Sequence, residues 1–285
     1  MSHLFAFLQY LLPHHALSRF IAMFAETVLF RKALIKAFIG FYKVDMSEAL
    51  LSDLDQFENF NAFFTRELKP DARPLVEGES AVVCPADGVI SQAGAIEKDS
   101  LLQAKGRFFK VADLLGDDSA LVDDFSAGTF ATIYLSPRDY HRVHMPLAGR
   151  LEKMIYVPGR LFSVNQRMAG YVPNLFARNE RVICLFQTRA GPMVLVLIGA
   201  MIIAGIETVW SGQVCPSPRT RKLRVMSYET YSPPIELPTG AEMGRFKSGS
   251  TAIVLFGPGT IELDAALTAK TPVRMGQLLG TLKAN

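Results

Sequence analysis

Two histidines close together in the chain are the side chains best suited to proton transfer. The sequence holds five histidines, and only His141 and His144 lie beyond residue 15. Imidazole has an ordinary pKa near neutrality and therefore serves readily as a general acid or base. A metal site and a purely structural role are the alternatives for this pair. The body of the chain offers no third histidine and its cysteines are scattered, which favours acid–base chemistry over a zinc site.

A serine preceded by a glycine is a second candidate for chemistry. Gly249 and Ser250 stand in the stretch Phe246 to Thr251, ahead of the apolar run 252–256. Glycine adopts backbone shapes that other residues resist, so this peptide bond can be strained. If Ser250 Oγ attacks the carbonyl of Gly249, the amide becomes an ester, and elimination with loss of ammonia leaves a pyruvoyl group. Taken alone, however, Gly-Ser-Thr is also an ordinary turn signal before a strand.

Asp87 is a third candidate. It precedes Gly88, and the pair is typical of a turn between two strands. A turn aspartate most often hydrogen-bonds to the backbone, which is the simpler interpretation. The other interpretation is a catalytic carboxylate.

The elements that must position these residues indicate an α+β fold, with N-terminal amphipathic helices followed by a largely antiparallel β body. A helix is predicted over residues 47–64, with Ser47 as its N-cap, and a proline-containing linker follows at residues 70–74. Short runs rich in Val, Ile and Leu predict strands over residues 81–83, 130–135, 181–186 and 192–198.

The N-terminal arm, residues 1–45, differs in charge from the body. Residues 1–44 carry five Lys or Arg and one Glu, whereas the whole chain has a net charge of only +3. Apolar residues recur in the arm at helical spacing, but no stretch reaches the ~18 to 20 apolar residues of a membrane-spanning helix. We expect amphipathic helices that contact an anionic bilayer, with packing on the protein's own core as the alternative.

Composition sets further limits. With 49% hydrophobic and 20% charged residues, the chain can bury a substantial core. The body shows no basic excess, so no nucleic-acid partner is expected. The cysteines are odd in number and match neither a zinc pattern nor a disulfide framework, which predicts reduced thiols in a cytosolic compartment: Cys84, Cys184 and Cys215.

Several segments taken together resemble the phosphatidylserine decarboxylase family, in its bacterial membrane-associated type. The resemblance rests first on residues 135–146, 174–181 and 242–246, the last leading to Gly249-Ser250-Thr251. Residues 161–165 and 273–277 extend it over nearly the whole chain from about residue 45. The family's usual leucine before this glycine is Ser248 here.

The resemblance implies self-cleavage between Gly249 and Ser250. The products would be a β chain, residues 1–249, and an α chain, residues 250–285, within a catalytic domain that spans residues 46–285. It further implies that Asp87, His144 and Ser250 act as the triad of this cleavage. Ser250 would become a covalent pyruvoyl group, with no metal and no diffusible cofactor.

The activity implied is a step of phospholipid biosynthesis, the conversion of phosphatidylserine to phosphatidylethanolamine and CO2 through a Schiff base with the pyruvoyl group. His141 would act in decarboxylation as a proton donor. The resemblance also implies a peripheral protein on the cytoplasmic face of the cell membrane, and a homodimer is compatible with it. The alternatives are a membrane-associated lipid serine hydrolase that uses Asp87, His144 and Ser250, or a non-catalytic peripheral membrane protein; no Gly-x-Ser-x-Gly elbow surrounds Ser250.

Overall fold

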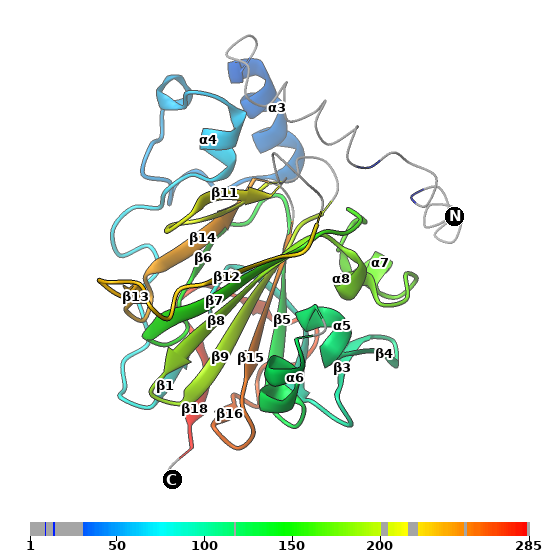
Figure 1. Ribbon diagram of the computed structural model, residues 1–285. Helices are drawn as coiled ribbons and strands as arrows, with labels where there is room; N and C mark the ends of the chain where they lie inside the picture. Colours follow the sequence, from blue (N-terminus) through cyan, green and yellow to red (C-terminus); the bar gives the residue numbers. More distant parts are fainter. Residues whose placement is uncertain are drawn as a thin grey trace.

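The computed structural model describes residues 9, 14, 31–116, 118–200, 205–215, 222–247 and 250–283 (Figure 1). Antiparallel sheets make up most of this part, and short helices surround them, so the predicted α+β fold is confirmed. The helices predicted over residues 1–30 and the residues Ser248 and Gly249 lie outside the described residues.

The largest sheet among the described residues has nine strands and runs through the centre of the molecule (Figure 1). Its order is β12-β7-β8-β9-β15-β5-β2-β17, and β13 pairs with β7. The strands predicted over residues 130–135, 181–186 and 192–198 are confirmed as parts of β5, β8 and β9. The strand bounds are β2 (Gly88–Ala95), β5 (Thr129–Leu135), β7 (Gly149–Val157), β8 (Arg181–Thr188), β9 (Gly191–Ile198), β12 (Arg224–Ser227), β13 (Glu236–Leu237), β15 (Ser250–Phe256) and β17 (Pro272–Val273).

The central strands of this sheet are buried on both faces, which explains their unbroken apolar sequences. In β15, Ala252 and Val254 belong to one hydrophobic core, while Ile253 and Leu255 belong to a second core on the opposite face. A strand with only one buried face would alternate apolar and polar residues instead.

Smaller sheets and helices supply the two layers that cover this sheet. A four-stranded sheet and a three-stranded sheet contribute to the first core: β11 (Gly212–Cys215), β10 (Ile206–Thr208), β14 (Glu242–Phe246) and β6 (Arg142–His144), then β1 (Ala81–Val83), β18 (Leu278–Leu282) and β16 (Ile261–Leu263). The second core lies under a hairpin and four short helices: β3 (Ser100–Ala104), β4 (Arg107–Lys110), α5 (Val111–Leu115), α6 (Ser119–Phe125), α7 (Gln166–Ala169) and α8 (Leu175–Arg178).

The continuous helix predicted over residues 47–64 is wrong. Two short helices occupy its second half, the 3-10 helix η1 (Leu54–Gln56) and α4 (Phe60–Phe64). The Asp53 side chain accepts a hydrogen bond from the backbone of Asp55, and the Asn59 side chain accepts one from Ala62. Each side chain therefore caps a new helix start, and this local bonding competes with a continuous helix.

The described part of the arm packs on the body. Helix α3 (Arg31–Tyr42) buries Ile35 in a third core, which it shares with phenylalanines of the following segment: Phe57, Phe60, Phe63 and Phe64. On its outer side, Leu34 is 43% exposed and Phe41 is 79% exposed. Among the described residues, no helix has the length and apolar character to cross a membrane.

Candidate active site

The chain leaves the large sheet and returns to it at one place, where His141 and Ser250 lie. After β5 it crosses to β6 in the four-stranded sheet, and after β14 it crosses back to β15. The two passages meet, because Phe246 donates its backbone N–H to the carbonyl of His141 at 2.9 Å, and Ser250 pairs in register with Leu135. Residues far apart in the sequence are thereby held by two neighbouring sheets.

Ser250 is the first residue of β15 and is fully buried. Its hydroxyl oxygen has no hydrogen-bond partner among the described residues. Buried hydroxyls usually bond to something, because an unpaired polar group in the interior costs about 1 to 3 kcal/mol. The hydroxyls of Thr132, Thr208 and Thr251 are also buried without a described partner, so this feature makes Ser250 a candidate for a chemical role without singling it out.

His141 lies beside this serine in the topology. Its Nε2 is 3.1 Å from the carbonyl oxygen of Ser136, which follows the register partner of Ser250. A carbonyl only accepts, so Nε2 carries the proton and Nδ1 has the lone pair. Nδ1 is buried and has no partner in the described part of the chain.

The surroundings of His141 keep its ring uncharged. The imidazole is completely buried and stacks on Phe64, with ring centroids 4.0 Å apart. Burial, with a smaller contribution from the charge of Arg66, lowers the pKa of His141 to about 3. The ring can therefore accept a proton only if its environment changes.

His144 is fixed at both ring nitrogens. Its Nδ1 lies 2.8 Å from the carbonyl oxygen of Gly240, and its Nε2 lies 3.0 Å from the hydroxyl oxygen of Tyr140. Because the carbonyl must accept, Nδ1–H donates, and Nε2 accepts the hydroxyl proton of Tyr140. Burial lowers the pKa of His144 below its ordinary value, so this ring too is neutral.

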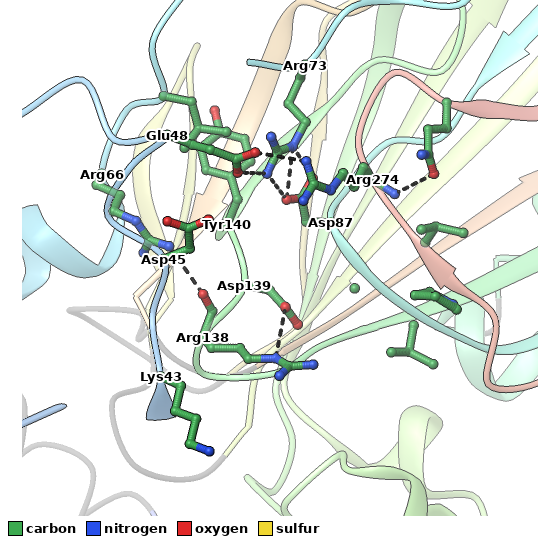
Figure 2. A pocket seen from close by; sticks show the side chains of 16 residues that line it. Lys43, Asp45, Glu48, Arg66, Arg73, Asp87, Arg138, Asp139, Tyr140 and Arg274 are labelled. Atoms are coloured by element: carbon green, nitrogen blue, oxygen red, sulfur yellow. Dashed lines mark hydrogen bonds and ion pairs between the residues drawn. The ribbon is translucent and has the colours of Figure 1, made fainter. Parts of the chain in front are cut away.

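Asp87 binds a neighbouring arginine and a backbone amide. Arg73 Nε is 2.9 Å and 3.0 Å from the two carboxylate oxygens, and Arg73 Nη2 is 2.5 Å from one of them (Figure 2). The backbone N–H of Met275 donates to the same carboxylate at 2.9 Å. The turn at Asp87-Gly88 is confirmed, but it joins β1 of the three-stranded sheet to β2 of the large one.

The structure therefore brings the predicted residues together only in part. His141 and Ser250 are linked through two consecutive residues of β5 and its extension. No hydrogen bond between the described residues joins Asp87, His144 and Ser250 into a chain; the carbonyl of Gly240 takes the place at Nδ1 that a carboxylate holds in a triad.

Two residues that bind the candidate side chains, Tyr140 and Arg73, were not predicted from the sequence. Tyr140 stands four residues before His144 in an extended segment, so the two side chains fall on one side, and this spacing was an available signal. Arg73 lies in the proline-containing linker, where the sequence offers no sign that it reaches Asp87. Within the described ranges, no three His, Cys, Asp or Glu side chains gather in a way that would hold a metal ion, and the three cysteines are free and buried.

Comparison with known proteins extends these observations. A family model described as phosphatidylserine decarboxylase matches residues 60–281, and a second model, described as PSD, matches residues 4–43. A phosphatidylserine decarboxylase proenzyme of Ectopseudomonas mendocina is 59% identical over 280 residues, covering 97% of each chain. One of Pseudomonas aeruginosa is 58% identical over 283 residues, covering 98% of this chain and 97% of the relative. The chain therefore belongs to the phosphatidylserine decarboxylase family, and the resemblance seen in its motifs is confirmed.

Proposed function

We propose that this protein converts phosphatidylserine to phosphatidylethanolamine and CO2, using a pyruvoyl group that it makes from Ser250. Membership of the family and the names of its relatives support the reaction. The structural observation that carries the proposal is the fully buried hydroxyl of Ser250, which has no partner among the described residues. A lipid hydrolase with the same serine is disfavoured, since no Gly-x-Ser-x-Gly elbow surrounds Ser250.

The proposed cleavage is an internal rearrangement followed by hydrolysis. Ser250 Oγ attacks the carbonyl carbon of Gly249, and the bond from that carbon to the amide nitrogen breaks while the nitrogen takes a proton. The Cα proton of Ser250 and the ester carboxylate then leave, so that residues 1–249 end in a carboxylate. Water replaces the nitrogen of the resulting dehydroalanine, ammonia departs, and a ketone remains at position 250.

His144 is the proposed base for the serine. Its Nε2 has one lone pair, which Tyr140 occupies in the structure. Tyr140 must therefore release this bond before Nε2 can take the proton of Ser250. Asp87 makes no hydrogen bond to the ring, but its negative charge still raises the pKa of His144 slightly against the larger effect of burial.

The surroundings of Ser250 are compatible with a pyruvoyl group at this position. The side chain it replaces is buried, the uncharged ring of His141 binds the residue that follows its register partner, and no described hydrogen bond would be lost in forming it. When present, the ketone would draw electrons from the bond between the substrate's α-carbon and its carboxylate, which unmodified side chains cannot do. His141 is the proposed proton donor to that carbon, once its ring is protonated at Nδ1, the nitrogen that has no partner among the described residues.

The experiment that tests this function is mass spectrometry of the purified chain, with an assay for phosphatidylethanolamine. We expect fragments of residues 1–249 and 250–285, the second beginning with a ketone. His144→Ala should leave the full-length precursor, because removing a triad base costs about 10⁴-fold or more. His141→Ala should be cleaved and yet turn over poorly. A chain that stays intact while active would refute the cleavage proposal.

We further propose that the protein is peripheral to the cytoplasmic face of the cell membrane. The basic charge of residues 1–44 and the exposed Leu34 and Phe41 of α3 support this location. Leu34→Asp with Phe41→Asp should weaken flotation with phosphatidylserine vesicles. Val225→Asp is the matched control, since Val225 is also exposed, at 54%, but lies on β12. Equal loss in both variants would contradict a specific role for α3.

A further inference from the structure

A pocket lies next to the candidate active site, and its acidic side chains have more described partners than some of its cations. It has a volume of about 420 Å³, and its lining includes residues that follow α3 and α4 and residues of β2 and β17 at the edge of the large sheet. Figure 2 shows the side chains that line it. Lys43, Arg66 and Arg138 reach it from three different segments, and Asp87 and Tyr140 lie in its wall.

The acidic groups of this pocket already have donors. Asp45 accepts from the backbone of Ser47 at 2.8 Å, and Asp139 accepts from the backbone and hydroxyl of Ser136. The remaining carboxylates bind arginines: Glu48 binds Arg73 and Arg274, and Asp87 binds Arg73. Two of the four carboxylates, Glu48 and Asp87, are therefore paired with arginines other than Arg66 and Arg138.

Arg66 is the cation with the fewest partners for its burial. The residue is only 5% exposed, and Nη2 makes one long hydrogen bond, 3.2 Å, to the carbonyl of Arg138. Its guanidinium lies over the ring of Phe63, and Nε is buried without a partner among the described residues. No described carboxylate lies within ion-pair distance of it. Burial lowers the pKa of Arg66, while the charges of Asp87, Asp139 and Asp45 act on it in the opposite direction. An arginine keeps its charge, so this site holds a buried cation without a direct carboxylate partner among the described residues.

Arg138 and Lys43 add exposed cations at the mouth of the pocket. The Arg138 side chain is 62% exposed, and its only ion pair with a described residue is a long one, 3.9 Å, to Asp139. Lys43 follows α3 and is exposed. Guanidinium groups match the oxygens of a phosphate in shape and charge, and an ammonium adds a point charge.

We propose that this pocket binds the phosphate group of the lipid headgroup, with Arg66 as its buried anchor and Arg138 and Lys43 at its rim. The proposal rests on the proposed function. In a serine headgroup only one oxygen and one methylene separate the phosphorus from the carbon that loses CO2, so the two sites must be neighbours. Arg66 lies near His141, the proposed proton donor, because the His141 ring stacks on Phe64, two residues before Arg66, and the charge of Arg66 acts on that ring.

A bound phosphate would also assist His141. The charge of Arg66 holds the pKa of His141 down, in addition to the larger effect of burial. The single negative charge of a phosphodiester on Arg66 would offset that charge and make protonation of the ring easier. Substrate binding and proton donation would then be coupled through one arginine.

The test measures binding directly, so that it does not depend on turnover. The full chain carrying Ser250→Ala, which stays uncut, is titrated by phosphorus NMR with two probes, glycerophosphoserine and inorganic phosphate. Arg66→Gln removes charge-assisted hydrogen bonds to phosphate and should weaken glycerophosphoserine binding about 10-fold or more. The double variant Lys43→Gln with Arg138→Gln removes the two exposed cations and should weaken this binding about 3-fold or more. Arg107→Gln is the control, since Arg107 is exposed on β4, far from the pocket, and should change nothing (Figure 1).

Each outcome of this experiment either supports or overturns the proposed phosphate site. Tighter binding of glycerophosphoserine than of inorganic phosphate, lost in both pocket variants, supports the proposal. Equal binding of the two probes would overturn the headgroup assignment in favour of a free-phosphate site, and unchanged binding in both variants would overturn the pocket itself. If circular dichroism shows that Arg66→Gln is unfolded, the Lys43 and Arg138 variant decides alone. A chain that binds glycerophosphoserine but releases no CO2 from phosphatidylserine refutes the proposed function only.

Discussion

The pair formed by Arg73 and Asp87 gives a stability prediction that can be worked from the structure. The Arg73 side chain is 7% exposed and that of Asp87 is 10% exposed, so both charges are largely out of water. Removing one partner of a buried pair costs about 3 to 5 kcal/mol, because the other charge remains buried. Asp87 would keep the Met275 amide, which places the expected loss for Arg73→Gln near the lower end, about 3 kcal/mol.

The assay is urea unfolding of the uncut Ser250→Ala chain. Arg150→Gln is the matched control, because Arg150 pairs with Glu152 at 2.9 Å but is 43% exposed, and such a surface pair contributes about 1 kcal/mol or less. The double variant Arg73→Gln with Asp87→Asn should lose about 2 kcal/mol less than the sum of the single losses. Equal effects of the Arg73 and Arg150 changes, or strict additivity in the double variant, would refute the reasoning.

Other predictions concern the histidines and one glycine. The pKa of His141 is about 3 in the folded chain against an ordinary 6.5, so the unfolded chain binds the proton first and stability falls as pH drops from 6.5 toward 3, by about 1.4 kcal/mol per pH unit. His141→Phe should remove this part of the slope in urea unfolding, and an unchanged slope would contradict the neutral ring. Tyr140→Phe frees Nε2 of His144 and should speed precursor cleavage up to about 5-fold on gels, since one hydrogen bond is worth about 1 kcal/mol; slower cleavage would mean that the tyrosine carries the proton. Gly88→Ala should cost about 2 to 3 kcal/mol, because its Cβ would overlap a backbone carbonyl of β5; Gly94→Ala, with nearly the same φ and open space, is the control and should cost less.

The parts of the fold predicted from sequence are those set by local burial. β5, β8 and β9 were predictable because both faces of each strand are buried, which leaves an apolar run in the sequence. The helix predicted over residues 47–64 failed where two polar side chains, Asp53 and Asn59, compete for backbone N–H groups.

The site was predictable in its residues but not in its contacts. The two histidines of the body were rare enough to stand out, and His141 is linked to Ser250 through Ser136 and Leu135. The partners of His144 and Asp87 come from positions 240, 73 and 275, and such pairing depends on how distant segments pack. Arg66 is similar, because its lack of a carboxylate partner is visible only once the surrounding side chains are placed.

The position of β15 has a consequence for the fate of a cut chain. This strand lies between β9 and β5 in the middle of the large sheet, and the described residues after it return to the edge strand β17 and to the three-stranded sheet. A break before residue 250 would therefore leave two polypeptides whose strands pair with each other in the same sheets. Separating them would require dismantling the central sheet, so the nicked protein should melt in a single transition and behave as one molecule. If residues 250–285 were added to a separately refolded fragment of residues 1–249, the position of β15 between β9 and β5 would already be filled or closed. The precursor therefore has to fold before it is cut.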